Sequence, residues 1–220
     1  GPDDTHCLFT CGSRVPSHKQ YDENNFVIYK KGFLALDSGT RGNEKDFNLR
    51  HYYAQTVAHN CILIHMPDEP LAGYWGPRYE GPEGKLAYGG MNRTTGAVVK
   101  AFETGDLFTY VAGDATACYS DQKCALALRQ FVYVMPDIFV ICDRVVSTQA
   151  EYRKAWLLHT QNEPEVDGMT FRADEGEGRL FCRALLPAAA GFEKIGGPGK
   201  EFWASRSEEH TSELQSPNTI

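Results

Sequence analysis

Residues able to move protons or hold a metal ion stand beside strand-like apolar runs near the start of this 220-residue chain. The stretch Ser17 to Phe26 has the sequence SHKQYDENNF and leads into a run that ends in Asp37-Ser38-Gly39, and His59-Asn60 opens a second apolar run. Imidazole exchanges protons near neutral pH, and imidazole, carboxylate and amide groups all bind divalent metals. Because a rigid sheet can aim side chains at its strand ends, the pattern indicates part of an active site.

The elements that would position these residues are short β-strands. Runs rich in Val, Ile, Phe and Tyr alternate with turn residues, which predicts an all-β fold with antiparallel sheets packed as a sandwich. The run Phe131 to Arg144 predicts a hairpin with Pro136-Asp137 at its turn. No segment favours a long helix, and residues 51–58 suit a helical turn or a strand equally well. The predicted strands are 26–29, 33–36, 57–64, 97–102, 107–111, 126–134, 138–142, 155–158 and 180–185.

Composition limits both size and function. With 42% hydrophobic residues, the chain can bury one sizeable core or two small ones. A net charge of −7 argues against a nucleic-acid-binding protein, which needs a basic face, and no run approaches the roughly 20 apolar residues of a membrane-spanning helix. Local basic residues could still attract an anionic ligand, or, for the Lys pair, protect a strand edge from aggregation. They are Lys30, Lys31, Arg41, Lys45 and Arg50.

The seven cysteines show no clear disulfide pattern, because their number is odd. Cys61, Cys142 and Cys182 stand in apolar runs and are expected to be buried free thiols. Two pairs close in sequence could form disulfides, but neither has zinc-finger spacing with matching partners elsewhere. These pairs are Cys7 with Cys11 and Cys118 with Cys124.

The end of the chain is expected not to be native protein. Residues 206–217, RSEEHTSELQSP, are polar, have no apolar period and resemble a translated sequencing adapter, as in a metagenomic read. We therefore predict a β-sandwich domain over residues 1–204, truncated at both ends, and a disordered non-native tail over residues 205–220. His210 is accordingly excluded as a site residue.

As a set, the motifs resemble the C-terminal β-sandwich region of the heparinase II/III family of polysaccharide lyases, which is related to alginate and oligoalginate lyases. The resemblance covers about Arg14 to Leu186. It implies a supersandwich-like domain without the family's N-terminal α/α toroid, in a periplasmic or secreted protein that acts on an anionic polysaccharide. The motifs are Ser17-His18-x-x-x-Asp22-x-Asn24-x-Phe26, Leu34 to Gly39, His59-Asn60, Asp143-Arg144-Val145 and Trp156 to His159.

The resemblance implies β-elimination on a uronic-acid polysaccharide such as heparin, heparan sulfate or alginate. In this reaction the proton α to the uronate carboxylate is removed and the glycosidic oxygen on the next carbon leaves; a positioned acid or base contributes roughly 10²- to 10⁴-fold. His18 matches the family's catalytic His, although a lone His before a strand is otherwise a surface or turn residue. The family's other catalytic groups lie in the toroid, so the fragment alone is expected to be inactive.

The resemblance also implies a structural metal site, with zinc as the first expectation. Carried over position by position, the family's His, Asp and His ligands become Gln20, Asp37 and His59. Gln20 departs from the pattern, and because an amide oxygen binds zinc more weakly than imidazole does, Ca²⁺ or Mn²⁺ is an alternative. Without a metal, Asp37 would be a turn residue and His59 a hydrogen-bonded core residue.

Two other functions stay open. One is a non-catalytic carbohydrate-binding or structural sandwich, in which aromatic residues of Pro67 to Arg93 would stack on sugars instead of merely covering the sandwich. The other is a cupin-type metal enzyme, which is disfavoured because no His-x-His pair is followed by a Glu and a third His at suitable distances. Weaker site candidates are Asp22, Asn24, Asn25, His51, His65 and His159.

Overall fold

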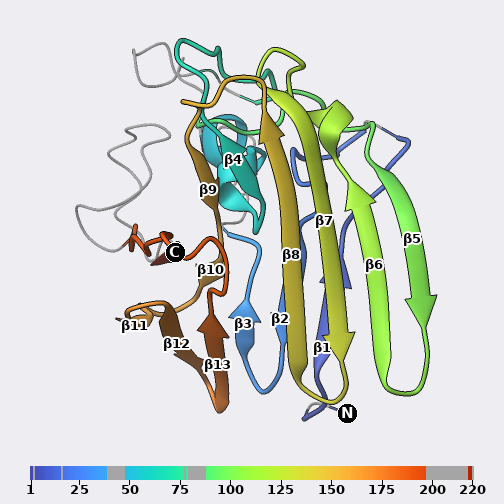
Figure 1. Ribbon diagram of the computed structural model, residues 1–220, viewed down its shortest axis with the longest axis vertical. Coiled ribbons are helices and arrows are strands. Elements are labelled where there is room, and N and C mark those ends of the chain that lie inside the picture. The colour runs from blue at the N-terminus through green and yellow to red at the C-terminus, as the bar shows by residue number, and fades with distance from the viewer. Residues whose placement is uncertain are drawn as a thin grey trace.

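Four long strands form an antiparallel meander across the front of the molecule (Figure 1). They are β5 (Val98–Thr104), β6 (Phe108–Asp114), β7 (Cys124–Val134) and β8 (Ile138–Ser147), in that spatial order. The predicted Pro136-Asp137 hairpin joins β7 to β8 and pairs Val134 with Ile138. The computed structural model describes residues 1, 3–15, 17–38, 48–76, 78, 88–196 and 218–219.

A second antiparallel sheet lies behind the meander and consists of β1 (His6–Phe9), β2 (Phe26–Tyr29) and β3 (Phe33–Ala35) (Figure 1). Its inner face packs on β6 and β7, where the Phe26 and Phe131 rings lie 5.5 Å apart. Alternate residues of β7 are buried because successive side chains point to opposite faces of a sheet. The structure thus confirms the predicted all-β antiparallel sandwich.

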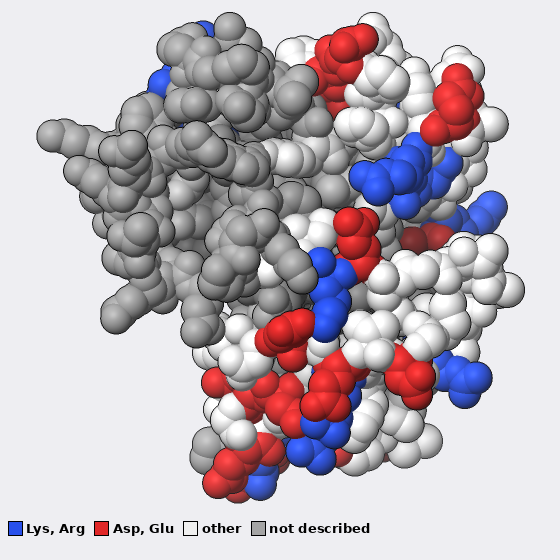
Figure 2. Space-filling view, turned by 90° about the vertical axis from the view of Figure 1, so that its left-hand side faces the viewer, with Lys and Arg blue, Asp and Glu red and all other residues white. Residues whose placement is uncertain are grey.

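Smaller sheets extend the sandwich on the other side of β8. Strand β4 (Ile62–Ile64) pairs with β9 (Lys154–Trp156), and β10 (His159–Thr160) pairs with β14 (Asn218–Thr219). A third small sheet contains β11 (Glu165–Asp167), β12 (Thr170–Glu175) and β13 (Gly178–Arg183). Figure 2 shows acidic and basic side chains interleaved over the lower part of this side, and ion pairs such as Arg172 with Glu165 and Arg179 with Asp174 account for them. This surface is therefore not a one-sign patch for a polyanion.

The segment between β3 and β4 forms helical turns, which decides between two alternatives for residues 51–58 and shortens a predicted strand. Helical turns, not a strand, fill residues 51–58: η1 (Leu49–Tyr53) is a π-helical turn and η2 (Thr56–Ala58) a 3-10 turn. The strand predicted over residues 57–64 is therefore limited to β4. The cause is the hydrogen bonding of two buried polar side chains, Thr56 and Asn60. They bond to backbone groups of other segments, and in a regular sheet those backbone groups would pair with a neighbouring strand instead.

All seven cysteines are free thiols. Cys61 is buried as expected, and Cys182 is half-buried. The expectation for Cys142 was wrong, because this residue is exposed. Successive side chains of β8 point to opposite faces, and Cys142 is on the face that points away from the sandwich. A further 3-10 turn, η4 (Thr116–Cys118), buries Cys118.

Arg129 on β7 links the two main sheets from inside the core. Its guanidinium donates to both carboxylate oxygens of Asp143 at 2.8 and 2.9 Å, and Nη1 donates to the carbonyls of Asn24 and Asn60. Burial opposes the charge, but Asp143 outweighs it and raises the pKa of Arg129. Arg129 is therefore paired with Asp143 on the neighbouring strand β8. This residue fixes the chain just before β2 and just before β4, where the candidate site residues lie.

Part of the predicted tail lies outside the described residues. Of residues 205–220, the structure describes only the backbone of β14, so the disordered non-native tail stays a prediction. Arg41 and Lys45 also lie outside the described residues. No helix among those described is long and apolar enough to cross a membrane.

Candidate functional site

His18 lies exposed on the loop between β1 and β2. Its φ of 56° is in the left-handed region, which residues other than glycine seldom adopt and which costs on the order of 1–3 kcal/mol. The imidazole meets the Trp75 ring edge-on, with centroids 6.1 Å apart. An accessible imidazole is thus held in one place by a backbone conformation that its surroundings must enforce.

Buried polar contacts hold this loop. The carboxylate of Glu23 is fully buried and accepts hydrogen bonds from the backbone N–H groups of Gly12 and Ser13, at 2.8 and 3.2 Å. Asn24 donates from its amide to the carbonyl of Gly113 at 2.8 Å. Position 113 must be glycine, because a Cβ there would collide with the Asn24 side chain. Asn24 therefore fixes the end of the His18 loop against β6.

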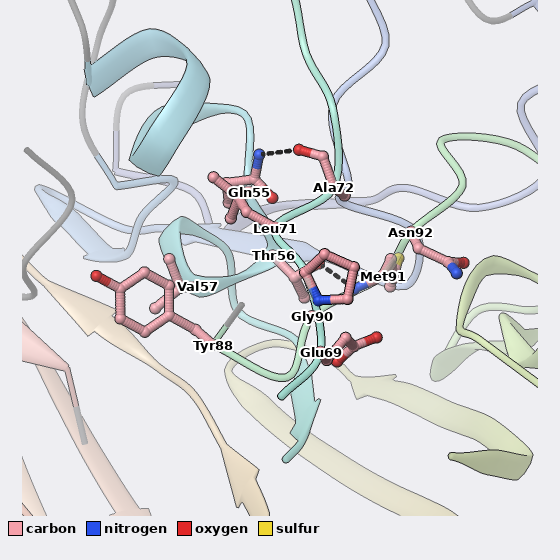
Figure 3. Close-up of a pocket in the computed structure, with 11 residues that line it drawn as sticks. Gln55, Thr56, Val57, Glu69, Leu71, Ala72, Tyr88, Gly90, Met91 and Asn92 are labelled. Carbon is pink, nitrogen blue, oxygen red and sulfur yellow. Dashed lines mark hydrogen bonds between the residues drawn. The ribbon is translucent and has the colours of Figure 1, made fainter. Parts of the chain in front are cut away.

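Trp75 belongs to a segment that follows β4 and is fastened to the His18 loop and to η1. Tyr21 Oη donates to the carbonyl of Gly73 at 2.5 Å. Gln55 Nε2 donates to the carbonyls of Arg50 and Ala72, at 2.7 and 3.1 Å, and the second of these bonds is drawn in Figure 3. Three segments far apart in sequence therefore converge beside His18.

A small pocket lies against the same segment (Figure 3). Residues of η2, of the stretch from Glu69 to Ala72 and of the stretch from Tyr88 to Asn92 line it. Glu69 binds Nζ of Lys123 at 2.6 Å, and both side chains are buried. Burial lowers the pKa of Lys123, whereas its bond to Glu69 acts in the opposite direction. Neither His18 nor any of the predicted metal ligands lines this pocket, and we assign its ion pair a structural role.

Asp37 and His59, two of the predicted metal ligands, are in direct contact. His59 is fully buried, and its Nδ1 shares a hydrogen bond with the carboxylate of Asp37. Burial disfavours protonation, but the charge and hydrogen bond of Asp37 outweigh it and raise the pKa of His59. Within the described part of the chain, His59 Nε2 is buried without a hydrogen-bond partner. Gln20 is half-buried and makes no side-chain hydrogen bond there.

Asn60 and His159 form a structural network next to this pair. The amide of Asn60 donates to the carbonyls of Phe26 and Leu36, and its Oδ1 accepts from the backbone N–H of His159 at 2.7 Å. Burial lowers the pKa of His159 to about 3, so the ring is neutral at ordinary pH. A buried neutral imidazole with its Nε2 3.0 Å from the Val57 carbonyl cannot exchange protons with a substrate. His159 is therefore a core residue.

The basic residues separate into two groups. Lys30 and Lys31 lie at the far end of β2 from the His18 loop, and Lys30 pairs with Asp137 at 2.5 Å. Arg50 instead lies beside the segment that carries Trp75: its Nη2 is 3.9 Å from the position that a Cβ on Gly73 would take. Arg50 is half-buried, and no carboxylate of the described residues lies within ion-pair distance of it. Among the described residues, no ion pair therefore neutralises its charge.

Sequence reasoning did not place Trp75 beside His18, or Arg50 beside the segment of Trp75. The only sequence signal for Trp75 was the high aromatic content of its segment, and for Arg50 it was a scattered basic cluster. The importance of Glu23 had no signal at all. Within the described residues, no group of three or more His, Cys, Asp and Glu side chains could hold a metal, so the Gln20, Asp37 and His59 set stays a prediction.

Comparison with known proteins agrees with this architecture. The family model described as "Heparinase II/III-like, C-terminal" matches residues 2–219. Two crystal structures of heparan sulfate lyase HepC from Pedobacter heparinus, one of them a mutant, are similar to the chain, each with a TM-score of 0.67 and 17% sequence identity. Among curated proteins, none matches the chain in sequence.

The extent of these matches determines what they show. Each HepC match covers 98% of this chain but only 30% of the HepC chain, so this chain corresponds to less than a third of those proteins. At 17% identity the likeness shows a shared fold. The family match extends over nearly the whole chain and agrees with the resemblance found in the motifs. The chain belongs to the heparinase II/III-like family and represents its C-terminal domain.

Proposed function

We propose that this chain is the β-sandwich portion of a longer lyase that cleaves a uronic-acid-containing polysaccharide by β-elimination. The observation that carries the proposal is the exposed His18 imidazole, held in a left-handed backbone conformation in a chain of this family. The similarity to heparan sulfate lyase HepC supports a heparin-like or heparan sulfate-like substrate. His59 and His159 are fully buried and cannot take the same role.

In the proposed reaction, neutral His18 accepts the proton on the carbon α to the uronate carboxylate. The electron pair of that C–H bond forms a double bond to the neighbouring carbon, and the bond from that carbon to the glycosidic oxygen breaks. A proton donor then protonates the leaving oxygen. The double bond joins two ring carbons next to the carboxylate, so it is conjugated and absorbs ultraviolet light. Proton transfer by a positioned group contributes roughly 10²- to 10⁴-fold.

Beside Trp75, the described part of this chain offers one accessible imidazole, that of His18. β-Elimination also needs a donor for the leaving oxygen and groups that neutralise the uronate. We propose that these groups come from the remainder of the longer protein. The isolated chain should therefore have negligible lyase activity.

An ultraviolet assay for the unsaturated product tests this function. The longer protein should generate product from heparan sulfate or heparin, and the 220-residue chain should generate none. Carboxyl-reduced heparan sulfate is the matched control and should not be cleaved, because its α-hydrogen is no longer acidic. Failure of the longer protein on heparin, heparan sulfate and alginate would reject the proposed function. Turnover by the chain alone would show that it contains every catalytic group.

We also propose that His59, Asp37 and Gln20 hold a divalent metal, with zinc as the first choice. The buried, unpartnered Nε2 of His59 supports this, since it is a strong zinc ligand in a position where an unpaired polar atom is costly. Asp37 orients the ring through Nδ1, as carboxylates beside metal-binding histidines do, and has a second carboxylate oxygen. When bound, the metal would cross-link the segments before β2, after β3 and before β4. Its role would be structural.

Metal removal should therefore lower stability. We expect about one zinc per chain by elemental analysis, and a lower melting temperature after treatment with a chelator; a metal at 100 times its Kd adds about 2.7 kcal/mol. Asp37→Ala and His59→Ala should reduce the metal content, whereas His65→Ala, which alters an exposed His, should not.

Gln20→His should tighten zinc binding at least about tenfold, because imidazole binds zinc better than an amide does. Metal-free protein with an unchanged melting temperature would contradict the proposal.

A further inference from the structure

An exposed aromatic surface adjoins His18. The Trp75 side chain is 40% exposed, and its ring stacks on that of Tyr74 with centroids 5.9 Å apart and planes 30° apart. The ring of His18 meets it at 80°. Aromatic rings offer a large, rigid apolar face beside polar groups, and the C–H face of a pyranose is its natural complement. The surface beside His18 is thus suited to a sugar ring.

The positively charged Arg50 lies next to the segment that carries Trp75. Arg50 is on η1, and the backbone from Gly73 to Gly76 packs directly on η1: a Cβ at Gly76 would lie 3.3 Å from Leu49. Burial raises the pKa of Tyr21 and the charge of Arg50 acts in the opposite direction, which places the guanidinium near the phenol that holds Gly73. Guanidinium binds carboxylate and sulfate oxygens through paired N–H groups. In a chain with a net charge of −7, such a local cation is what an anionic sugar requires.

Three hydrogen bonds that fasten this segment run through groups other than the indole and the guanidinium. The segment is held through the Glu69 carboxylate and through the carbonyls of Ala72 and Gly73. Exchange of Trp75 or Arg50 side chains therefore leaves these bonds in place. This separates a binding role from a folding role in experiments.

We propose that Trp75 and Arg50 form a saccharide subsite next to His18, in which a pyranose ring packs on the indole and an anionic substituent of the sugar, carboxylate or sulfate, pairs with the guanidinium. The choice of a uronan as the ligand rests on the proposed function. The subsite itself rests on the ring contact of Trp75 with His18 and on the packing of η1, which carries Arg50, against the segment of Trp75. It gives the sandwich a share in holding substrate in addition to its imidazole.

Calorimetric titration of the 220-residue chain with defined tetrasaccharides tests the subsite. The ligands are a heparan sulfate tetrasaccharide, its unsulfated counterpart, and the unsulfated form with reduced carboxyl groups. Trp75→Ala should weaken all three complexes at least about tenfold, because stacking does not depend on charge. Arg50→Gln should weaken the charged complexes about 10- to 100-fold and leave the uncharged one unchanged. An Arg50 effect with the unsulfated ligand identifies carboxylate as the partner, and an effect confined to the sulfated ligand identifies sulfate.

Matched variants control for folding. Trp75→Phe keeps an aromatic face and should retain most of the affinity. Phe181→Ala removes another exposed aromatic side chain, 73% exposed, from β13 on the lower left of Figure 1, and should bind like the unmodified chain. Melting temperatures of all variants should agree within about 4 °C. Wild-type affinity of Trp75→Ala and Arg50→Gln for the sulfated tetrasaccharide would overturn the subsite.

The longer protein distinguishes failure of the subsite from failure of the proposed function. If it cleaves a uronan, Trp75→Ala should raise KM at least about tenfold with a smaller change in kcat, since it removes binding that substrate and transition state share. Cleavage with an unchanged KM in Trp75→Ala would reject the subsite and leave the lyase assignment intact. Tetrasaccharide binding that depends on Trp75, without any cleavage by the longer protein, would reject the lyase function and leave a carbohydrate-binding sandwich.

Discussion

Replacing His18 by Ala in the longer lyase should lower kcat at least about 100-fold, with little change in KM. The physical reason is that His18 is the accessible imidazole of the site, and loss of a positioned proton carrier removes roughly 10²- to 10⁴-fold. The rate is read from the ultraviolet absorbance of the unsaturated product. Imidazole added to the buffer should restore part of the activity of His18→Ala, because it can occupy the space of the lost ring.

A second substitution separates chemistry from backbone strain at this position. Asn tolerates a left-handed conformation better than most residues, so His18→Asn should keep the loop in place at φ 56° and still lack the proton carrier. We expect it to be as inactive as His18→Ala. His65→Ala, at another exposed His, should retain full activity. Activity of His18→Asn within about tenfold of the unmodified enzyme would show that His18 acts only on the shape of the loop.

Replacing Arg129 by Met should lower the free energy of unfolding by about 3–5 kcal/mol. This substitution leaves the Asp143 carboxylate in the core without its partner, and also leaves the carbonyls of Asn24 and Asn60 without a donor. Arg129→Lys should recover little of the loss, since one ammonium cannot reach the four oxygens that a guanidinium plane reaches. Urea unfolding of the 220-residue chain measures these differences.

Two further variants show where the energy resides. Arg144→Met alters the neighbouring exposed Arg of β8 and should change stability by less than about 0.5 kcal/mol. The double variant Arg129→Met with Asp143→Leu should be more stable than Arg129→Met alone, because it leaves no unpaired buried charge. A loss below about 1 kcal/mol for Arg129→Met would mean that water reaches this ion pair.

Local pattern was enough to predict most of the sandwich. The β7–β8 hairpin follows from alternation and a Pro-Asp turn, and both are properties of neighbouring residues. The short strand β1 gave no such signal, because its first three residues are exposed and it is defined by pairing with β2. Residues 57–64 misled for the opposite reason: they are apolar, but the buried amide of Asn60 takes over the backbone pairing of a strand.

The candidate site was predictable in its chemistry and not in its geometry. His18, Asp37 and His59 stood out by residue type, and the structure brings Asp37 and His59 into contact. The approach of Trp75 to His18 depends on hydrogen bonds between segments far apart in the sequence, such as Tyr21 with Gly73, 52 residues apart, which no local pattern encodes. Whether Gln20 joins the metal site stays a prediction.

The hydrogen bonds that hold the segment from Glu69 to Trp75 also affect the rate at which a ligand associates. Buried Lys123 holds Glu69, Gln55 holds Ala72 and Tyr21 holds Gly73, so this backbone is already ordered in the free protein. Ordering a loop at the moment of binding would remove conformational entropy and weaken the complex. A preorganised platform avoids that loss and needs no slow closing step, so a sugar chain can dock on the sandwich at a rate set by diffusion and orientation alone. If the subsite binds a sugar chain, association should therefore be fast, and affinity should be set by the rate of dissociation.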